Sequence, residues 1–156
     1  MGRSTQDGEQ VVASNRKARH DYELLERYEG GLKLTGDEVK SLRAGRASLV
    51  DAYGRVREGE VWLEGMHVPP YEQGDTRRHL PVRPRKVLLH RREIEEIGHD
   101  LAEKGLSLVP LRVYFTHGIA KVELALARGK RRHEKRQAIA KREAQREMER
   151  AAGRRR

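Results

Sequence analysis

The chain of 156 residues carries 34 Lys and Arg against 24 Asp and Glu, a formal net charge of +10, and it has no cysteine. A chain of this length suits one domain with extensions, and the lack of cysteine excludes disulfides and thiol chemistry. No apolar run is long enough to span a bilayer, and the N-terminus lacks the apolar core of a signal peptide. We therefore expect a soluble cytoplasmic protein with no membrane partner.

The excess of positive charge lies at the C-terminal end. Residues 129–156 hold 12 basic and 4 acidic residues, a net of +8, whereas the first 128 residues are nearly balanced. Such a segment is typical of a protein that binds a polyanion, either nucleic acid or an anionic membrane surface. We predict three parts: a flexible N-terminus over residues 1–10, a folded domain over 11–128 and a basic tail over 129–156.

The first long segment of the domain, residues 22–34, is ambiguous. Its local propensity favours a helix, yet Gly30 and Gly31 with the following leucines also fit a strand with a bulge or bend. A clearer helix follows, because Thr35 precedes Glu38 by three residues as in a capping box. Gly45 is suited to the left-handed stop of that helix.

The middle of the chain reads as strands. Residues 53–57 and 60–64 alternate around a Glu-Gly turn and predict a β-hairpin. Residues 67–84 hold four of the five prolines and form a long loop, mobile or functional. Residues 85–90, "RKVLLH", predict a short buried strand.

The last part of the domain combines a helix with a second hairpin. Ile94, Ile97 and Leu101 lie at helical spacing before a stop at Gly105. Residues 111–126 alternate around a Thr-His-Gly turn and predict a hairpin with one solvent-exposed face. Together the patterns predict a mainly β fold: an antiparallel barrel of about six strands with two or three flanking helices.

No pattern of an enzyme or metal site emerges. The seven histidines lack ligand spacing, and the neighbouring Glu95 and Glu96 point to different sides of a helix. The glycine pairs lack the phosphate-cradling loop of nucleotide-binding proteins. We therefore expect a binding protein that catalyses no reaction and needs no metal or cofactor.

Four segments resemble a known family when taken in order and spacing. They are "NRKARHDY" at 15–22, "YEGGLKLTGDEVKSLRAG" at 28–45, "RKVLLH" at 85–90 and "GKRRHEKR" at 129–136. They are similar to the SmpB family of SsrA-binding proteins, and the similarity runs from about residue 11 to residue 136. The resemblance implies an oligonucleotide-binding-like barrel, with residues 22–34 as one of its strands.

The resemblance also implies a function in bacterial trans-translation. The protein would bind the tRNA-like domain of transfer-messenger RNA, also called SsrA RNA, and deliver it to stalled ribosomes. The stalled peptide would then be tagged for degradation and the ribosome rescued. Implied partners are the ribosome and elongation factor Tu with the alanylated RNA, and the protein would be a monomer on the RNA. The alternative is a general structured-RNA-binding barrel, such as a ribosomal protein or RNA chaperone, with a basic extension.

Several RNA-binding residues, Gly30 among them, follow from the matching motifs. Asn15 is expected to contact the RNA directly. Leu88 is expected to be a core residue that shapes the RNA surface, with a direct contact to the RNA as the alternative. For Glu29 two roles stay open: accepting a hydrogen bond from a base or ribose hydroxyl, or holding a loop at Gly30 and Gly31. The expected phosphate contacts are the basic side chains Arg16, Lys17, Arg19, Arg43, Arg46, Arg85 and Lys86.

The tail is rich in good helix formers, with a thin apolar stripe that includes Ala144 and Met148. We predict a tail that is disordered in the free protein and helical on a polyanionic surface. The resemblance implies that this surface is the empty messenger-RNA channel and decoding site of the small ribosomal subunit, with Met148 as a distal anchor. Glu134 stands where many relatives have Asp, which leaves any contact by that carboxylate open. The expected decoding-site residues are Lys130, Arg131, His133, Glu134, Lys135 and Arg136.

Overall fold

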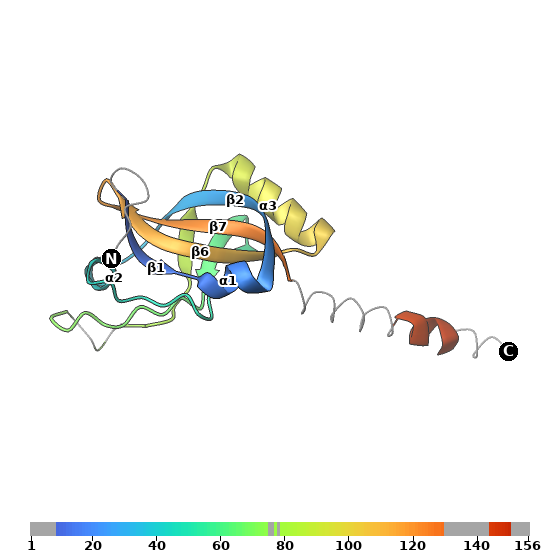
Figure 1. The fold of residues 1–156 in the computed structure, drawn as a ribbon, viewed down its shortest axis with the longest axis horizontal. Coiled ribbons are helices and arrows are strands. Elements are labelled where there is room, and N and C mark those ends of the chain that lie inside the picture. Colours follow the sequence, from blue (N-terminus) through green and yellow to red (C-terminus); the bar gives the residue numbers. More distant parts are fainter. Residues whose placement is uncertain (1–8, 75–76, 78, 130–143, 151–156) are drawn as a thin grey trace.

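The computed structural model describes residues 9–74, 77, 79–129 and 144–150. Its elements are β1 (Glu9–Ser14), α1 (Arg16–Asp21), β2 (Tyr22–Leu32), α2 (Gly36–Arg43), β3 (Tyr53–Arg57), β4 (Glu60–Glu64), β5 (Arg85–Leu88), α3 (Arg91–Lys104), β6 (Ser107–Thr116) and β7 (Ile119–Gly129). Residues 144–150 form a further helix within the tail (Figure 1).

Six strands close into a ring. The order β6-β3-β4-β5-β2-β7 returns to β6, and every neighbouring pair is antiparallel. The additional strand β1 pairs with residues 112–116 of β6, whereas β3 meets β6 at Leu108. Both therefore use one edge of β6, at opposite ends. The predicted antiparallel barrel of about six strands is confirmed.

The ambiguous segment is a strand, as the resemblance implied. Strand β2 pairs with β7 along most of its length and with β5 at its end. A register shift lies between Leu24 and Arg27, so the bulge falls before the glycines and not at Gly30 and Gly31. Tertiary pairing on both edges of the strand overrides its local helix propensity.

The elements with strong local sequence signals form where they are predicted. The β3–β4 hairpin turns at Glu58 and Gly59, both with positive φ, as a two-residue turn of this hand requires. Helix α2 has the predicted capping box between Thr35 and Glu38. Helix α3 ends at Gly105 in the left-handed conformation, with φ of 62°.

The β6–β7 hairpin differs from the prediction of one solvent-exposed face. A register shift lies between Pro110 and Arg112, and a bulge of this kind redirects the side chains that precede it. Val109 and Leu111 therefore pack outside the barrel with Ala18 of α1, and a second apolar cluster forms there. The main core fills the ring, and Ile97 of α3 is buried against it.

The folded domain begins earlier than predicted. Glu9 and Gln10 belong to β1 and pair with Thr116 and Phe115, so residues 9 and 10 are not part of a flexible N-terminus. The Glu9 carboxylate also accepts a hydrogen bond of 2.9 Å from Arg112, which a composition-based boundary misses. Among the described residues, no helix is long and apolar enough to cross a membrane.

Candidate nucleic-acid interface

Strand pairing brings residues of separate motifs into rows on the outside of the barrel. In one row Leu88 of β5 pairs with Gly31 of β2, Gly31 with Lys121 of β7, and Lys121 with Tyr114 of β6. A neighbouring row runs from Glu29 through Glu123 to Arg112. Because paired residues point to the same side of a sheet, these side chains share one surface. We call it the four-strand face, formed by Glu29, Gly31, Leu88, Arg112, Tyr114, Lys121 and Glu123.

Leu88 is exposed, which corrects its expected place in the core. Its side chain is 52% exposed, whereas Val87 beside it is fully buried. In β5 the alternation turns Arg85 and Val87 inward and Lys86 and Leu88 outward. Leu88 therefore presents an apolar side chain on the four-strand face.

Glu29 lies on β2, the strand that pairs with β5 of Leu88, and one of its carboxylate oxygens already accepts a hydrogen bond. The buried Tyr114 hydroxyl donates a hydrogen bond to Glu29 Oε2. The other oxygen, Oε1, lies 4.0 Å from Lys121 Nζ, and the Glu29 side chain is half exposed. Gly30 and Gly31 belong to strand β2, so the alternative role of Glu29 in holding a glycine loop is wrong.

Gly30 allows β2 and β5 to approach closely. A Cβ at this position would lie 2.6 Å from Val87 Cγ1 and 2.9 Å from the Leu88 carbonyl oxygen. A Cβ at Gly31 would meet nothing nearer than 3.8 Å. Gly30 is therefore a spacing residue beneath the four-strand face, and not itself a group that RNA can touch with a side chain.

Asn15 anchors helix α1. Its Oδ1 accepts from the Ala18 amide at 3.2 Å, and its Nδ2 donates to the Pro110 carbonyl at 3.0 Å. The side chain thus caps the helix and ties it to β6, a structural role beside the expected contact with RNA. The exposed basic side chains on α1 are Arg16, Lys17 and Arg19.

A second basic group lies at the end of α2. Arg43 is exposed and holds its guanidinium 4.9 Å from the centre of the Phe115 ring. Arg46 follows the helix and lies 3.7 Å from Glu72. Helices α1 and α2 occupy separate ends of the barrel in Figure 1, so the expected phosphate contacts form two groups and not a single patch.

Arg85 does not belong to either group, which corrects its expected contact with phosphate. Its side chain is fully buried. Nε donates to Glu38 Oε2 at 2.7 Å, and the other donors reach the carbonyls of Met66, Arg83 and Pro81. Arg85 therefore fastens the proline-rich loop to α2. Lys86 stays at the surface, with Nζ 3.6 Å from Glu60.

The Glu38 carboxylate is held ionised by these arginines. Burial alone would raise its pKa, but hydrogen bonds from Arg83 and from the Thr35 amide, together with the charge of Arg85, lower the pKa of Glu38 below its ordinary value. The sequence shows Glu38 only as part of a capping box. Its second role appears once residues 83–85 are folded against it.

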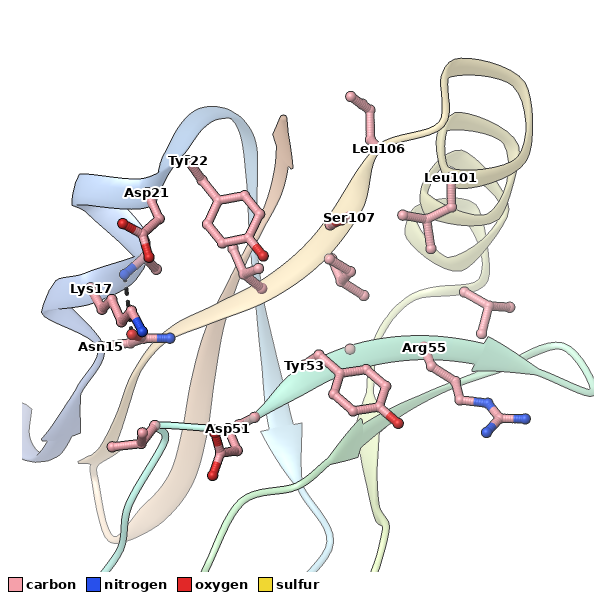
Figure 2. A pocket seen from close by; sticks show the side chains of 17 residues that line it. Asn15, Lys17, Asp21, Tyr22, Asp51, Tyr53, Arg55, Leu101, Leu106 and Ser107 are labelled. Carbon is pink, nitrogen blue, oxygen red and sulfur yellow. Dashed lines mark hydrogen bonds between the residues drawn. The ribbon is translucent and has the colours of Figure 1, made fainter. Parts of the chain in front are cut away.

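A cleft of about 640 Å³ opens between α1, β3 and β6. Figure 2 shows Tyr22 and Tyr53 on its two sides, with Lys17 and Arg55 nearby. The motif at 15–22 contributes one wall, and β3 with residues 50–52 before it contributes the other. Sequence reasoning missed Tyr53 and Arg55, since they carry no motif, and it likewise gave no role to Tyr114 or Lys121.

The tail lies mostly outside the described residues. This applies to the predicted decoding-site residues Lys130, Arg131, His133, Glu134, Lys135 and Arg136. Met148 lies on the helix 144–150, where its side chain is 68% exposed. Folding of the tail on a partner stays a prediction. No group of three His, Asp or Glu side chains within the described part of the chain is arranged to hold a metal ion.

A closed antiparallel barrel with exposed cationic helices and a basic tail defines a small β-barrel protein with the charge distribution of a nucleic-acid binder. Comparison with known proteins makes the assignment specific. The family model described as SmpB protein matches residues 12–154. The chain belongs to the SmpB family.

Individual relatives agree with this assignment. The chain is 62% identical to the SsrA-binding protein of Salinispora arenicola, covering 95% of this chain and 93% of the relative. It is 60% identical to the SsrA-binding protein of Desulforudis audaxviator, with 92% and 94% covered. Among solved structures, it is similar to a chain from "tmRNA-SmpB: a journey to the center of the bacterial ribosome", with a TM-score of 0.63, 48% identity and coverage of 81% and 92%.

Proposed function

We propose that this chain is an RNA-binding protein of trans-translation that binds the tRNA-like domain of SsrA RNA. The observation that carries the proposal is the convergence of two family motifs on the four-strand face, where Gly31 pairs with Leu88 and Glu29 lies in the next row. The names of the relatives support the choice of RNA.

The chemistry of the four-strand face suits recognition of folded RNA by shape. Its basic side chains, Arg112 and Lys121, are matched by Glu29 and Glu123, so it offers little net charge to a phosphate backbone. Exposed Leu88 provides an apolar contact, and Glu29 provides an acceptor for a base or ribose hydroxyl donor. The basic groups on α1 and α2 add phosphate contacts that orient the RNA.

The tail serves a second surface in this proposal. Its net charge of +8 over residues 129–156 favours a polyanion, and a helix at 144–150 with exposed Met148 suits a segment that lies against RNA. We assign it to the empty messenger-RNA channel and decoding site, with His133 as the decoding-site residue. Delivery to stalled cytoplasmic ribosomes as a monomer on the RNA, together with elongation factor Tu, completes the proposal.

Competition between RNAs tests the binding function. Labelled SsrA RNA is bound to the full chain, and unlabelled bulk tRNA or unlabelled SsrA RNA is added as competitor. We expect SsrA RNA to displace the label at far lower concentration. Equal competition would support the alternative, a general structured-RNA-binding barrel, and would contradict the proposal. Leu88→Asp is the interface variant, with Val82→Asp as a matched control at an equally exposed apolar position outside the four-strand face.

Removal of the tail tests the division of labour. A chain that ends at Gly129 keeps all strands of the barrel, since β7 ends there. We expect it to bind SsrA RNA with nearly full affinity and to lose peptide tagging on stalled ribosomes. Loss of RNA binding in the truncated chain, with the barrel still folded by circular dichroism, would refute the two-part assignment.

A further inference from the structure

Tyr114 is buried at the centre of a polar chain on the four-strand face. Its side chain has no exposed surface, and its hydroxyl donates to Glu29 Oε2. Strand β7 lies between β6, which carries Tyr114, and β2, which carries Glu29; Tyr114 pairs with Lys121 of β7 and Glu29 pairs with Glu123 of β7. The Tyr114 side chain therefore crosses over β7 to reach β2. One Glu29 oxygen is thus held from below, and the side chain remains half exposed.

The position of Tyr114 is itself fixed by charged neighbours. The Arg112 guanidinium lies 4.1 Å from the centre of the Tyr114 ring, a cation–π contact. Arg112 in turn donates to Glu9 Oε1 at 2.9 Å and to Glu123 Oε1 at 3.1 Å. The chain of contacts runs from β1 through β6 to β2. Rotation of the tyrosine ring would break contacts with more than one strand.

The phenol of Tyr114 remains a hydrogen-bond donor. Burial, followed by the hydrogen bond and charge of Glu29, raises the pKa of Tyr114 above its ordinary value. A neutral phenol has one proton to donate, and an ionised carboxylate can only accept a hydrogen bond. The bond therefore has a fixed direction, from Tyr114 to Glu29.

We propose that Tyr114 is a positioning residue that orients the Glu29 carboxylate, so that Oε1 is presented to a donor group of the RNA. The inference rests on the proposed contact between Glu29 and RNA and adds the group that makes this contact specific. A glutamate side chain frozen before binding loses less conformational freedom when the RNA arrives. With Oε2 occupied, Oε1, which lies 4.0 Å from Lys121 Nζ, is the oxygen that accepts from a ribose hydroxyl or base amino group at a defined place.

Tyr114→Phe in the full chain is the first test. The change removes the hydroxyl and keeps the ring beneath Arg112. We expect affinity for SsrA RNA, measured by fluorescence anisotropy, to fall about tenfold, as for a hydrogen bond to a charged group. The midpoint of thermal unfolding should change little, since the freed Glu29 oxygen is within reach of water.

Tyr28→Phe is the matched control. Tyr28 lies on β2 next to Glu29. Like the Tyr114 hydroxyl, its hydroxyl donates to a carboxylate, here Glu96 Oε2 at 3.3 Å. That bond joins β2 to α3 and does not touch the four-strand face. The control should leave affinity for SsrA RNA unchanged. An equal loss of affinity in both variants would mean a general structural effect and would overturn the proposal.

A double-mutant cycle with Glu29→Ala separates positioning from structure. If Tyr114 acts through Glu29, Tyr114→Phe should cause no further loss of affinity once Glu29 is alanine. Additive losses would refute the positioning role while the proposed RNA contact stands. A normal affinity of Glu29→Ala would refute that contact and the positioning role together. Failure of all RNA preference in the unchanged chain would instead overturn the proposed function.

Discussion

Arg85 of β5 donates from Nε to Glu38 Oε2 of α2 at 2.7 Å, with both side chains buried. This pair joins two of the matching family segments, residues 28–45 and 85–90, through the interior of the protein. The same arginine binds carbonyls of the proline-rich loop, including Pro81. Its role is to fasten the loop and the helix to the barrel.

Arg85→Ala should destabilise the fold strongly. Removal of the guanidinium leaves the Glu38 charge buried with one partner fewer, and breaking a buried pair typically costs about 3–5 kcal/mol. Urea denaturation measures the free energy of unfolding. Lys86→Ala, one residue along the same strand and facing solvent, is the control and should change stability by no more than about 0.5 kcal/mol. Equal effects of the two changes would contradict the assignment of Arg85 to the interior.

Stability should fall in acid because of Glu38. The folded protein lowers the pKa of Glu38 below the ordinary value of 4.5, so the unfolded state binds the proton more readily. The stabilisation is present above pH 4.5 and is lost as the pH falls through the lower, folded pKa. The measurement is the free energy of unfolding as a function of pH. Glu38→Gln should be less stable at neutral pH and should flatten this acid dependence; an unchanged slope would exclude Glu38 as the source.

Gly30 and Gly31 should respond differently to alanine. A Cβ at Gly30 would meet Val87 at 2.6 Å and the Leu88 backbone at 2.9 Å, whereas at Gly31 the nearest atom is 3.8 Å away. We expect Gly30→Ala to cost about 1–3 kcal/mol of stability by overpacking and to weaken RNA binding by moving Leu88. Gly31→Ala should lie within about 0.5 kcal/mol of the natural protein. Thermal unfolding and RNA affinity are measured for both variants. A larger loss in Gly31→Ala than in Gly30→Ala would contradict these assignments.

Asn15 and Arg19 should separate structure from charge on α1. Asn15→Ala removes the helix cap and the bond to Pro110 and should cost about 1 kcal/mol. Arg19→Ala should leave stability unchanged and reduce the slope of log affinity against log salt by about 1, as for one lost phosphate contact. An unchanged slope would remove Arg19 from the interface. A fully stable Asn15→Ala would show that the cap contributes nothing.

The elements predicted well are those with local causes. The hairpin at 53–64 needs a two-residue turn, and Glu58 and Gly59 provide it. Thr35 and Glu38 cap α2 through a contact only three residues apart. The sequence predicts an antiparallel barrel of about six strands as a fold class. Which strands pair depends on contacts between residues far apart in sequence, for which no short pattern exists.

The failed predictions involve residues whose environment is tertiary. Arg85 is buried and Leu88 is exposed, the opposite of what their side-chain chemistry suggests. The reason is that the inward and outward alternation of β5 is set by its pairing with β2 and β4 and not by hydropathy. The bulge before Arg112 moves Leu111 out of the main core. Tyr114 and Glu29 lie 85 residues apart, so their bond is invisible until the barrel is closed.

The N-terminal strand finds its partner only at the far end of the domain. Glu9 and Arg112 are 103 residues apart in sequence, and β2 takes β7 as its main neighbour. Such distant pairings slow folding because the loop between them must close first. During synthesis, β1 lacks its partner until β6 follows, and β2 lacks its main partner until β7 follows. The barrel of a nascent chain therefore closes only once β7 has been made, just before the basic tail.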